Sequence, residues 1–471
     1  MAYPVVLLFI FLYICCETFG QLAVPEQVHL SLANEPNAMT VTWVTMAPLN
    51  NNVKPVVEYG LSQTNLQFSA NAQTNDFEYN GVHRYIHSVT LKNLYFNTTY
   101  YYQVGSTLGW SHVFHFKTFP QGNDFSYKVV IFGDLGNFNG VSMPYLQKAA
   151  MNGEFDLAIH VGDIAYDLHT ENGIGGDNFT RQMEPVIAYV PYMVIAGNHE
   201  DDLKNFSNYK NRFVMPDNGY GDNQFYSFDL GPIHFLGVST EYYGFFNEYG
   251  HMPVINQYNW LENDLKQADA NRAAVPWILS YQHRPFYCSN ENSEECTSFE
   301  NTLIKSGFED LPGLESLYLK YGMDLGFWGH EHSYERFWPS SGRQIFNQTS
   351  NPYHNAAAPT YIVTGAAGCH SGHALFENPP SPASASRIND YGYTMLHVVN
   401  KTHLFIEQIS VEAGNQVVDQ IWLSKDLQHA PKPDYAKTQQ FILFPEPKVC
   451  NPRDVQCRGK YSHKKRNPAS F

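Results

Sequence analysis

The sequence predicts an all-β sandwich of immunoglobulin or fibronectin III type, followed by an α/β domain. The chain has 471 residues, which is too long for one hydrophobic core of ordinary size, so two domains are expected. A change of pattern along the chain places the division. Residues 21–119 show only strand-like alternation, whereas residues 125–425 alternate short apolar runs with helix-like segments.

The first region contains the runs AMTVTWVT, VVEYG, HRYIHSVTL and TTYYYQVGS, which are rich in Thr, Val and Tyr and are separated by Asn, Gly and Pro. Such runs are typical of short strands that end in tight turns. No helical period of useful length interrupts them. We expect Trp43 in the core of this sandwich, and we assign the domain no chemistry.

The second region has helix-like segments at QYNWLENDLKQADANR and GLESLYLKYG. Strand-like texture returns from PTYIVTGAAG through YTMLHVVNKTHLFIEQIS, and PPSPASAS near residue 380 predicts a loop. Residues 426–471 are expected to form a C-terminal extension.

The formal net charge is −16, which argues against a nucleic-acid partner, because a phosphate backbone attracts basic surfaces. The one concentrated basic run, KYSHKKRNP near the C-terminus, is expected to be a solvated tail. An acidic protein that handles an anionic substrate needs local positive charge, and bound metal is one source.

The N-terminus is typical of a secretory signal peptide over residues 1–20. Its apolar run from Val5 to Cys16 is too short to span a bilayer, and Thr18 and Gly20 precede an acceptable cleavage point. A buried N-terminal strand is the alternative. No further apolar stretch could span a membrane, so we expect a protein of the extracellular space or of a lysosome-like vesicle. Five N-x-S/T acceptor sites for N-glycosylation agree with secretion: Asn97, Asn178, Asn205, Asn347 and Asn400.

The cysteines favour a disulfide-bonded secreted protein. Without the signal peptide five remain, and Cys288 lies close to Cys296 as Cys450 does to Cys457. Two short-range disulfides, with Cys369 buried and free, are the preferred pairing. The odd number leaves intermolecular pairing open.

Five apolar runs of the second region end in residues that can bind metal, and glycine precedes the binding residue in four of them. Ligands bind beyond the carboxyl ends of strands in open α/β sheets, and glycine lets the backbone turn sharply there. The runs and their endings are KVVIF with Asp134, LAIHV with Asp163 and Tyr166, YMVIA with Asn198 and His199, WILSYQ with His283, and DLGFW with His330 and His332.

Each of these residues alone has an ordinary explanation. Asp after Gly is usually a turn or an N-cap, and a single His at a strand end is usually a hydrogen-bonded core or rim residue. Five coincidences at the same structural position are hard to generate by packing, and the donors exceed the four of a zinc site. The set predicts a binuclear metal site, with His330 and His332 on adjacent ions. Two ions about 3.5–4 Å apart clamp both oxygens of an in-line phosphoryl displacement.

The set resembles the purple acid phosphatase branch of the metallophosphoesterases. That family's blocks, GDxG, GDxxY, GNH(D/E), a block ending in a ligand His, and GHxH, occur here in order, and the resemblance covers most of the chain. It implies a four-layer αββα metallophosphoesterase sandwich behind the β-sandwich, as in the long two-domain animal members. It also implies an acid phosphatase that hydrolyses phosphate monoesters at a binuclear Fe(III)–M(II) centre by attack of metal-bound hydroxide.

The resemblance assigns each donor to an ion. The ferric ion, one per chain, would be held by Asp134, Tyr166 and His332; the divalent ion, zinc first and otherwise iron or manganese, by Asn198, His283 and His330; and Asp163 would bridge them. A tyrosine with an ordinary pKa of about 10 must lose its proton to bind, which suits a trivalent ion. This is the reason for a tyrosine three residues after Asp163.

The family's phosphate-contacting histidine corresponds to His199, which we expect to be catalytic through transition-state stabilisation, with Glu200 as its partner. Plant members carry further histidines where this chain has Asn292 and Ser293. The proton donor for the leaving group is therefore open between His199 and solvent. Three further residues are candidates for the substrate rim, namely Arg284, His370 and His373, and Arg284 is equally expected to brace its loop by an ion pair.

Two other functions stay open. One is a phosphodiesterase or nucleotidase of the same superfamily with two divalent ions and Tyr166 unligated. The other is a non-catalytic secreted binding protein with a vestigial site, against which the intact donor set argues. The physiological substrate, the divalent ion and the oligomeric state do not follow from the sequence.

Overall fold

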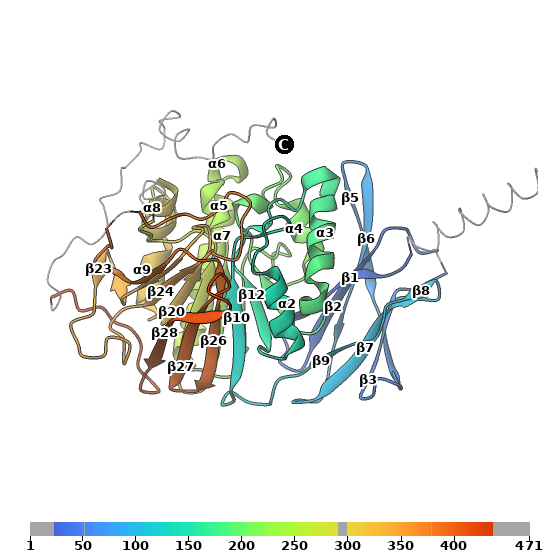
Figure 1. Ribbon diagram of the computed structural model, residues 1–471, viewed down its shortest axis with the longest axis horizontal. Helices are drawn as coiled ribbons and strands as arrows, with labels where there is room; N and C mark the ends of the chain where they lie inside the picture. Colours follow the sequence, from blue (N-terminus) through green and yellow to red (C-terminus); the bar gives the residue numbers. More distant parts are fainter. Residues whose placement is uncertain (1–22, 51, 291–298, 378, 437–471) are drawn as a thin grey trace, which may run out of the picture.

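The computed structural model describes residues 23–50, 52–290, 299–377 and 379–436. Within these ranges a β-sandwich stands beside a larger α/β domain (Figure 1), so the predicted fold class is confirmed. The predicted signal peptide over residues 1–20 and most of the predicted C-terminal extension lie outside the described residues.

Two antiparallel sheets form the sandwich, with the strand orders β1-β2-β6-β5 and β4-β3-β7-β8, and β9 also pairs with β7. Trp43 on β2 is fully buried, as predicted. The strands are β1 (Glu26–Leu32), β2 (Met39–Thr45), β3 (Val56–Gly60), β4 (Phe68–Asn71), β5 (Gln73–Tyr79), β6 (Val82–Leu91), β7 (Thr99–Ser106), β8 (Gly109–Trp110) and β9 (Phe114–Lys117).

The α/β domain contains two mixed sheets. The six-stranded sheet has the order β14-β12-β10-β26-β27-β28, and its strands are β10 (Tyr127–Phe132), β12 (Leu157–His160), β14 (Tyr192–Val194), β26 (Gly392–Asn400), β27 (His403–Ser410) and β28 (Gln416–Ser424). The seven-stranded sheet has the order β15-β16-β17-β20-β24-β21-β25, and its strands are β15 (Tyr226–Leu230), β16 (Ile233–Val238), β17 (Trp277–Gln282), β20 (Leu325–Trp328), β21 (Tyr334–Phe337), β24 (Thr360–Thr364) and β25 (Ser384–Ile388).

Helices cover the outer sides of this pair of sheets. Figure 1 shows α2 and α3 between the six-stranded sheet and the sandwich, and α8 and α9 on the other side of the domain. The predicted helical segments are α7 and α9. The helices are α2 (Met143–Met151), α3 (Thr170–Ile187), the single 3₁₀ turn η1 (Asn198–Glu200), α4 (Ser207–Arg212), α5 (Glu241–Gly244), α6 (Phe246–Tyr249), α7 (Met252–Ala270), α8 (Phe299–Ser306) and α9 (Leu314–Lys320).

Short paired segments complete the described fold. They are β11 (Leu135–Gly136) with β13 (Ile164–Ala165), β18 (Gly307–Phe308) with β19 (Leu311–Pro312), and β22 (Ser340–Ser341) with β23 (Gln344–Ile345).

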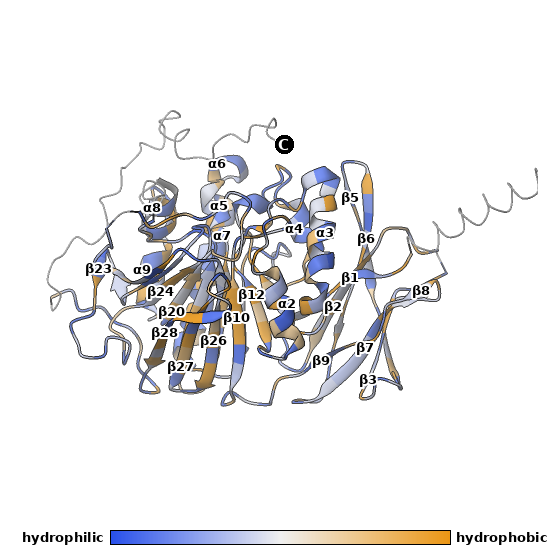
Figure 2. Cartoon of the chain, viewed as in Figure 1, coloured by the Kyte–Doolittle hydropathy of each residue, from blue (hydrophilic) through white to orange (hydrophobic). Residues whose placement is uncertain are grey.

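One continuous hydrophobic core joins the sandwich to the α/β domain, since Trp43 and Leu30 belong to the same buried cluster as Val129 on β10. Leu30 also forms a β-bridge with Pro191, the residue before β14. Figure 2 shows apolar residues concentrated in the central strands, including β10 and β12. The sandwich is therefore packed directly against the α/β domain and shares its hydrophobic core.

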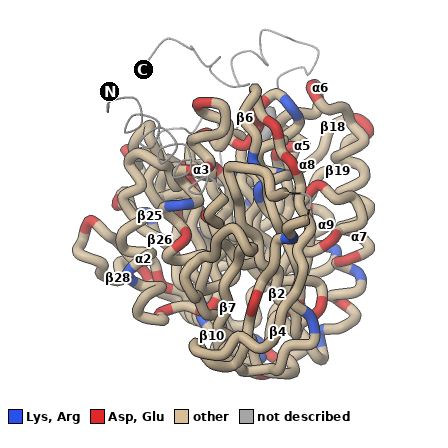
Figure 3. The backbone as a smooth tube through the Cα atoms, turned by 90° about the vertical axis from the view of Figure 1, so that its right-hand side faces the viewer, with Lys and Arg blue, Asp and Glu red and all other residues tan. Residues whose placement is uncertain are grey.

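Charged residues of both signs are interspersed over the face in Figure 3. None of the helices that the structure describes is long and apolar enough to cross a membrane.

Candidate metal centre

The five predicted runs form β10, β12, β14, β17 and β20, and the predicted donors follow each strand's carboxyl end. The first three strands belong to the six-stranded sheet and the other two to the seven-stranded sheet, which are the two sheets that the implied αββα sandwich requires. The site lies where the carboxyl ends of two sheets meet. Beyond β10 and β12 the short strands β11 and β13 pair in parallel, which holds two of the donor loops together.

Four of the predicted donors have left-handed backbone conformations: Asp134 (φ 61°), Asp163 (φ 53°), Tyr166 (φ 48°) and His330 (φ 72°). Non-glycine residues in this region cost of order 1–3 kcal/mol each and cluster at functional sites. The local backbone is therefore set by the requirement to aim these side chains inward.

The glycines before the donors mainly provide space. A Cβ on Gly197 would overlap Asp163 Oδ1, and a Cβ on Gly329 would lie 2.8 Å from Asp134 Oδ2. Gly162 does adopt the expected turn, with φ +90°, and a Cβ there would lie 2.5 Å from His283 Nδ1. Any larger residue at these positions would push a donor out of the cluster.

The predicted ferric set forms one contact group, called here the phenol triad: Asp134, Tyr166 and His332. The Tyr166 hydroxyl donates to Asp134 Oδ1 at 3.2 Å and lies 2.8 Å from His332 Nε2. Burial, followed by the charges of Asp134 and Asp163, raises the pKa of Tyr166 well above its ordinary value. The phenol therefore ionises only in the presence of a strong positive charge.

The predicted divalent set forms a second group, called here the imidazole triad: Asn198, His283 and His330. Asn198 Oδ1 lies 3.0 Å from His283 Nε2 and 2.9 Å from His330 Nδ1, and the two imidazoles are 3.2 Å apart at their nearest nitrogens. This triad carries no carboxylate of its own.

Asp163 belongs to both groups. Two sets of potential ligand atoms lie within 4.8 Å of one another, namely Asp163 with His283 and His330, and Asp163 with Asp134 and His332. Burial opposes a charge on His283, but Asp163 and then Asp134 raise its pKa to about 10. The carboxylates thus favour positive charge at the centre of the cluster.

The orientation of two imidazoles is fixed from outside the cluster. His283 Nδ1 donates to the Val161 carbonyl at 2.9 Å, which turns Nε2 inward. His332 Nδ1 lies 3.2 Å from the Gly372 carbonyl and 2.9 Å from Cys369 Sγ, which leaves Nε2 facing Tyr166. Such outer partners set the tautomer and ring plane of a ligand histidine.

Cys369 is buried and free, as predicted. The predicted pairings of Cys288 with Cys296 and of Cys450 with Cys457 each involve residues outside the described ranges, so they stay predictions.

His199 is held by Asp167, and its expected pairing with Glu200 is wrong. His199 Nδ1 lies 2.7 Å from Asp167 Oδ1, and the His199 ring is one-fifth exposed. Glu200 is buried and accepts hydrogen bonds from the backbone N–H groups of Gly197, Asp163 and Ile164. Its carboxylate is used to join two donor loops, so it cannot orient the imidazole. Asp167 was missed by the sequence analysis, although its position directly after Tyr166 could have indicated it.

The rim candidates divide. His370 lies at the site, with its ring centroid 4.9 Å from that of Tyr166 and 5.9 Å from that of His199. Arg284 is buried and its Nε donates to Glu241 at 3.0 Å, so the bracing interpretation is supported.

His373 stacks on Tyr391, with ring centroids 3.7 Å apart, and its Nε2 lies 3.5 Å from Glu412 Oε2. Asn292 and Ser293 lie outside the described residues.

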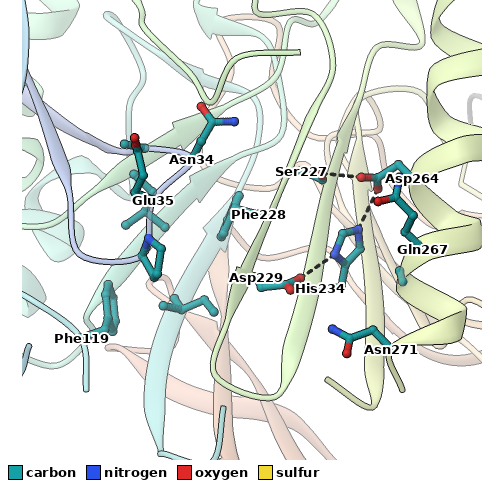
Figure 4. Close-up of a pocket in the computed structure, with 15 residues that line it drawn as sticks. Asn34, Glu35, Phe119, Ser227, Phe228, Asp229, His234, Asp264, Gln267 and Asn271 are labelled. Atoms are coloured by element: carbon teal, nitrogen blue, oxygen red, sulfur yellow. Dashed lines mark hydrogen bonds and ion pairs between the residues drawn. The ribbon is translucent and has the colours of Figure 1, made fainter. Parts of the chain in front are cut away.

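A separate pocket of about 580 Å³ lies at the boundary between the sandwich and the α/β domain (Figure 4). His234 separates two carboxylates on its wall, with Nδ1 2.6 Å from Asp229 Oδ1 and Nε2 2.8 Å from Asp264 Oδ2. No predicted donor lines this pocket. Its ion cluster is internally paired, and we assign it no chemistry.

Comparison with known proteins agrees with this geometry. Residues 25–118 match the family described as purple acid phosphatase, N-terminal domain, residues 127–334 match calcineurin-like phosphoesterase, and residues 358–420 match iron/zinc purple acid phosphatase-like protein C.

Relatives match over nearly the whole chain. A human protein named acid phosphatase type 7 is 45% identical over 412 residues, covering 86% of this chain and 92% of its own. An Arabidopsis thaliana protein named Fe(3+)-Zn(2+) purple acid phosphatase 12 is 30% identical over 428 residues, covering 87% and 86%. The solved structure of a purple acid phosphatase from yellow lupin seeds superimposes with a TM-score of 0.73 at 27% identity, covering 88% of this chain and 78% of that one.

The matched regions contain the sandwich, both donor triads and most of the antiparallel strands that close the six-stranded sheet. On this evidence the chain belongs to the purple acid phosphatase family of metallophosphoesterases.

Proposed function

We propose that this phosphatase hydrolyses phosphate monoesters at a centre of one ferric and one divalent ion. The observation that carries the proposal is the pair of donor triads that share Asp163, with a phenol in only one of them. This division gives each ion a chemically different set of ligands.

The donor chemistry fits such a pair of ions. Asp134 and Tyr166 supply two hard anionic oxygens to one position, which favours a trivalent ion able to displace the phenolic proton. The imidazole triad supplies one amide oxygen and two nitrogens, which suit zinc or another divalent first-row ion. The plant relative described as Fe(3+)-Zn(2+) makes zinc our first choice for the divalent ion.

When bound, the two ions supply Lewis-acid polarisation of the phosphoryl group and acidification of water. His199 stands at the edge of the cluster, with Nε2 3.9 Å from Asp163 Oδ2 and with Nδ1 held by Asp167. Its Nε2 can donate to a phosphoryl oxygen and stabilise the charge that develops there. His370, which is exposed beside Tyr166, completes the reachable rim.

The test of the function is hydrolysis of an aryl phosphate monoester and of the matching diester by the purified protein. We expect the monoester to be hydrolysed faster than the diester at acidic pH. A preference for the diester, in a protein without iron, would instead favour the reading with two divalent ions and an unligated Tyr166. Binding of two metals without hydrolysis of either substrate would favour a non-catalytic binding protein.

We also propose that the protein is secreted, or delivered to a lysosome-like vesicle, and glycosylated. The apolar run at residues 5–16 supports a signal peptide. Of the five acceptor asparagines, Asn347 is half-buried and the other four, Asn97, Asn178, Asn205 and Asn400, are exposed. The mature chain would comprise the sandwich at residues 21–119, the catalytic domain at 125–425 and the extension at 426–471. Sensitivity of the secreted protein to an N-glycosidase tests this proposal.

A further inference from the structure

A buried ion cluster connects the sandwich to the back of the metal centre. It consists of Arg84 on β6, Asp177 on α3 and Arg212 on α4, and these side chains are at most 3% exposed. Arg84 Nε and Nη2 both donate to the Asp177 carboxylate at 2.8 Å, and Arg212 Nη1 donates to it at 2.7 Å. Bidentate pairing of this kind fixes geometry as well as charge.

The same two arginines also hold the backbone at the start of α3. Arg84 Nη2 donates to the Asn172 carbonyl at 2.9 Å, and Arg212 Nη2 donates to the Gly173 carbonyl at 2.7 Å. The backbone there is left-handed, with φ 59° at Asn172 and 94° at Gly173. The arginines therefore support an irregular turn that the helix by itself would not maintain.

Two glycines on α3 explain how the guanidinium groups come so close. A Cβ on Gly173 would lie 2.8 Å from Arg84 Cζ, and a Cβ on Gly176 would lie 2.8 Å from Arg212 Cζ. Glycine lowers helix stability by about 0.5–1 kcal/mol relative to alanine, so a run of glycines in this helix is consistent with a packing requirement. The glycines of the segment ENGIGGDNF thus leave room for the two arginine side chains to pack against the helix backbone.

The cluster holds the segments that directly follow the two loops with the catalytic side chains. The turn at Asn172 follows Tyr166 and Asp167 within six residues, and the Asp167 carbonyl accepts from the Thr170 N–H at 3.2 Å and from its hydroxyl at 2.8 Å. Arg212 ends α4, the helix that follows the loop of Asn198 and His199.

We propose that Arg84 of the sandwich is a positioning residue for the metal centre, because it fixes the segment that aims Tyr166 and Asp167. The expected effect on kcat rests on the phosphatase function proposed above. Figure 1 shows β5 and β6 rising beside α3, on the side away from the two central sheets. The sandwich domain would then be part of the catalytic unit and not only a neighbour.

The chain provides a matched control. Arg181, also on α3, pairs across the same boundary with Glu26 of β1, at 3.1 Å from its Nε, but it is two-fifths exposed. Replacing either arginine by methionine removes one interdomain ion pair of similar length. Asp177 keeps Arg212 as a partner when Arg84 is replaced, so no buried carboxylate is left alone.

The experiment compares Arg84→Met, Arg84→Lys and Arg181→Met with the wild type by amide hydrogen exchange of the protein as isolated, and by kcat and KM for an aryl phosphate. We expect Arg84→Met to speed exchange roughly tenfold in peptides covering residues 163–176 and 198–212 and to lower kcat about tenfold at nearly constant KM. Arg84→Lys should lie between Arg84→Met and the wild type, and Arg181→Met should match the wild type in both measurements.

Wild-type exchange in both peptides of Arg84→Met would overturn the inference, as would acceleration spread evenly over the whole chain including β27 and β28. If Arg84→Met does not fold, Arg84→Lys decides by the same criteria. If the wild type hydrolyses no phosphate ester, the proposed function fails, and the exchange measurement still decides whether Arg84 positions these loops.

Discussion

The phenol triad and the imidazole triad differ in charge and in the way each is held. The phenol triad brings Asp134 and a buried Tyr166, whose ionisation requires a strong cation, whereas the imidazole triad has no carboxylate or phenol of its own. Asp163 is common to both. The two groups therefore offer ligands of different charge, although these ligands come from the same rim.

The largest effect is expected for Asp163→Asn, which removes the shared anionic donor. Both ions should be lost or exchange freely, and kcat should fall by more than about a hundredfold. Replacing a residue that only orients a metal ligand costs up to about a hundredfold, and loss of a ligand should cost more. Metal analysis and turnover on one sample check this outcome. Asp124→Asn, at an exposed aspartate between β9 and β10, is the control, and retention of both ions by Asp163→Asn would contradict a shared ligand.

The next pair of variants separates the triads. His332→Ala should release the ferric ion, and with it the visible colour, while the divalent ion stays bound. His330→Ala should release the divalent ion and keep the ferric ion and the colour. The reason is that His332 and His330 belong to different groups of potential ligands. The activity of each should fall at least about tenfold to a hundredfold. The same metal content in both variants would mean that the two triads do not bind separate ions.

His199→Ala tests a residue outside both triads. We expect kcat to fall by about 10²–10³, as for loss of one transition-state donor, with both ions retained. Asp167→Asn should have a smaller effect, about tenfold, because it loosens the imidazole without removing it. Normal turnover of His199→Ala would reject its catalytic role, and metal loss would assign it to the ligands.

The smallest effect is expected for His234, whose charge should affect the stability of the fold and not the metal centre, because it lies in the separate pocket. Burial opposes its charge, but Asp229 and Asp264 raise its pKa from 6.5 to about 9. The folded state therefore gains stability from this proton that is fully present below pH 6.5 and is lost as the pH rises through about 9.

The gain should be of order 1–3 kcal/mol at most, visible as a fall in Tm between neutral and alkaline pH. His234→Gln should be less stable at acidic pH and should lack most of that pH dependence, while keeping the colour of the metal centre. An identical pH profile of Tm in wild type and variant would contradict the assignment.

The site was predictable to a large extent because its information is local. The donors lie in the loops that follow apolar strands, and glycines such as Gly162 and Gly197 are required by the close approach of His283 and Asp163. The family resemblance then placed the donors in two groups, and the structure brings the same groups together.

Features that depend on partners distant in sequence could not be read from local patterns. The division of the strands over two sheets requires β10 to pair with β26, some 260 residues away, and only the family resemblance implied it. The partner of His199 was wrong because Glu200 is adjacent in sequence, while backbone geometry directs its carboxylate to other N–H groups. The role of Arg84 could not be read from a sandwich sequence, since Asp177 and Asn172, which accept its hydrogen bonds, lie on α3.

The most direct test of the central claim is a visible absorption spectrum of the purified protein with metal content determined on the same sample. We expect a broad visible band with about one iron and one second ion per chain, and loss of the band in Tyr166→Phe, because phenolate-to-Fe(III) charge transfer requires that oxygen. A colourless wild-type protein with full metal occupancy and no iron would contradict it. Tyr166 would then be a rim residue, and the two triads would hold two divalent ions.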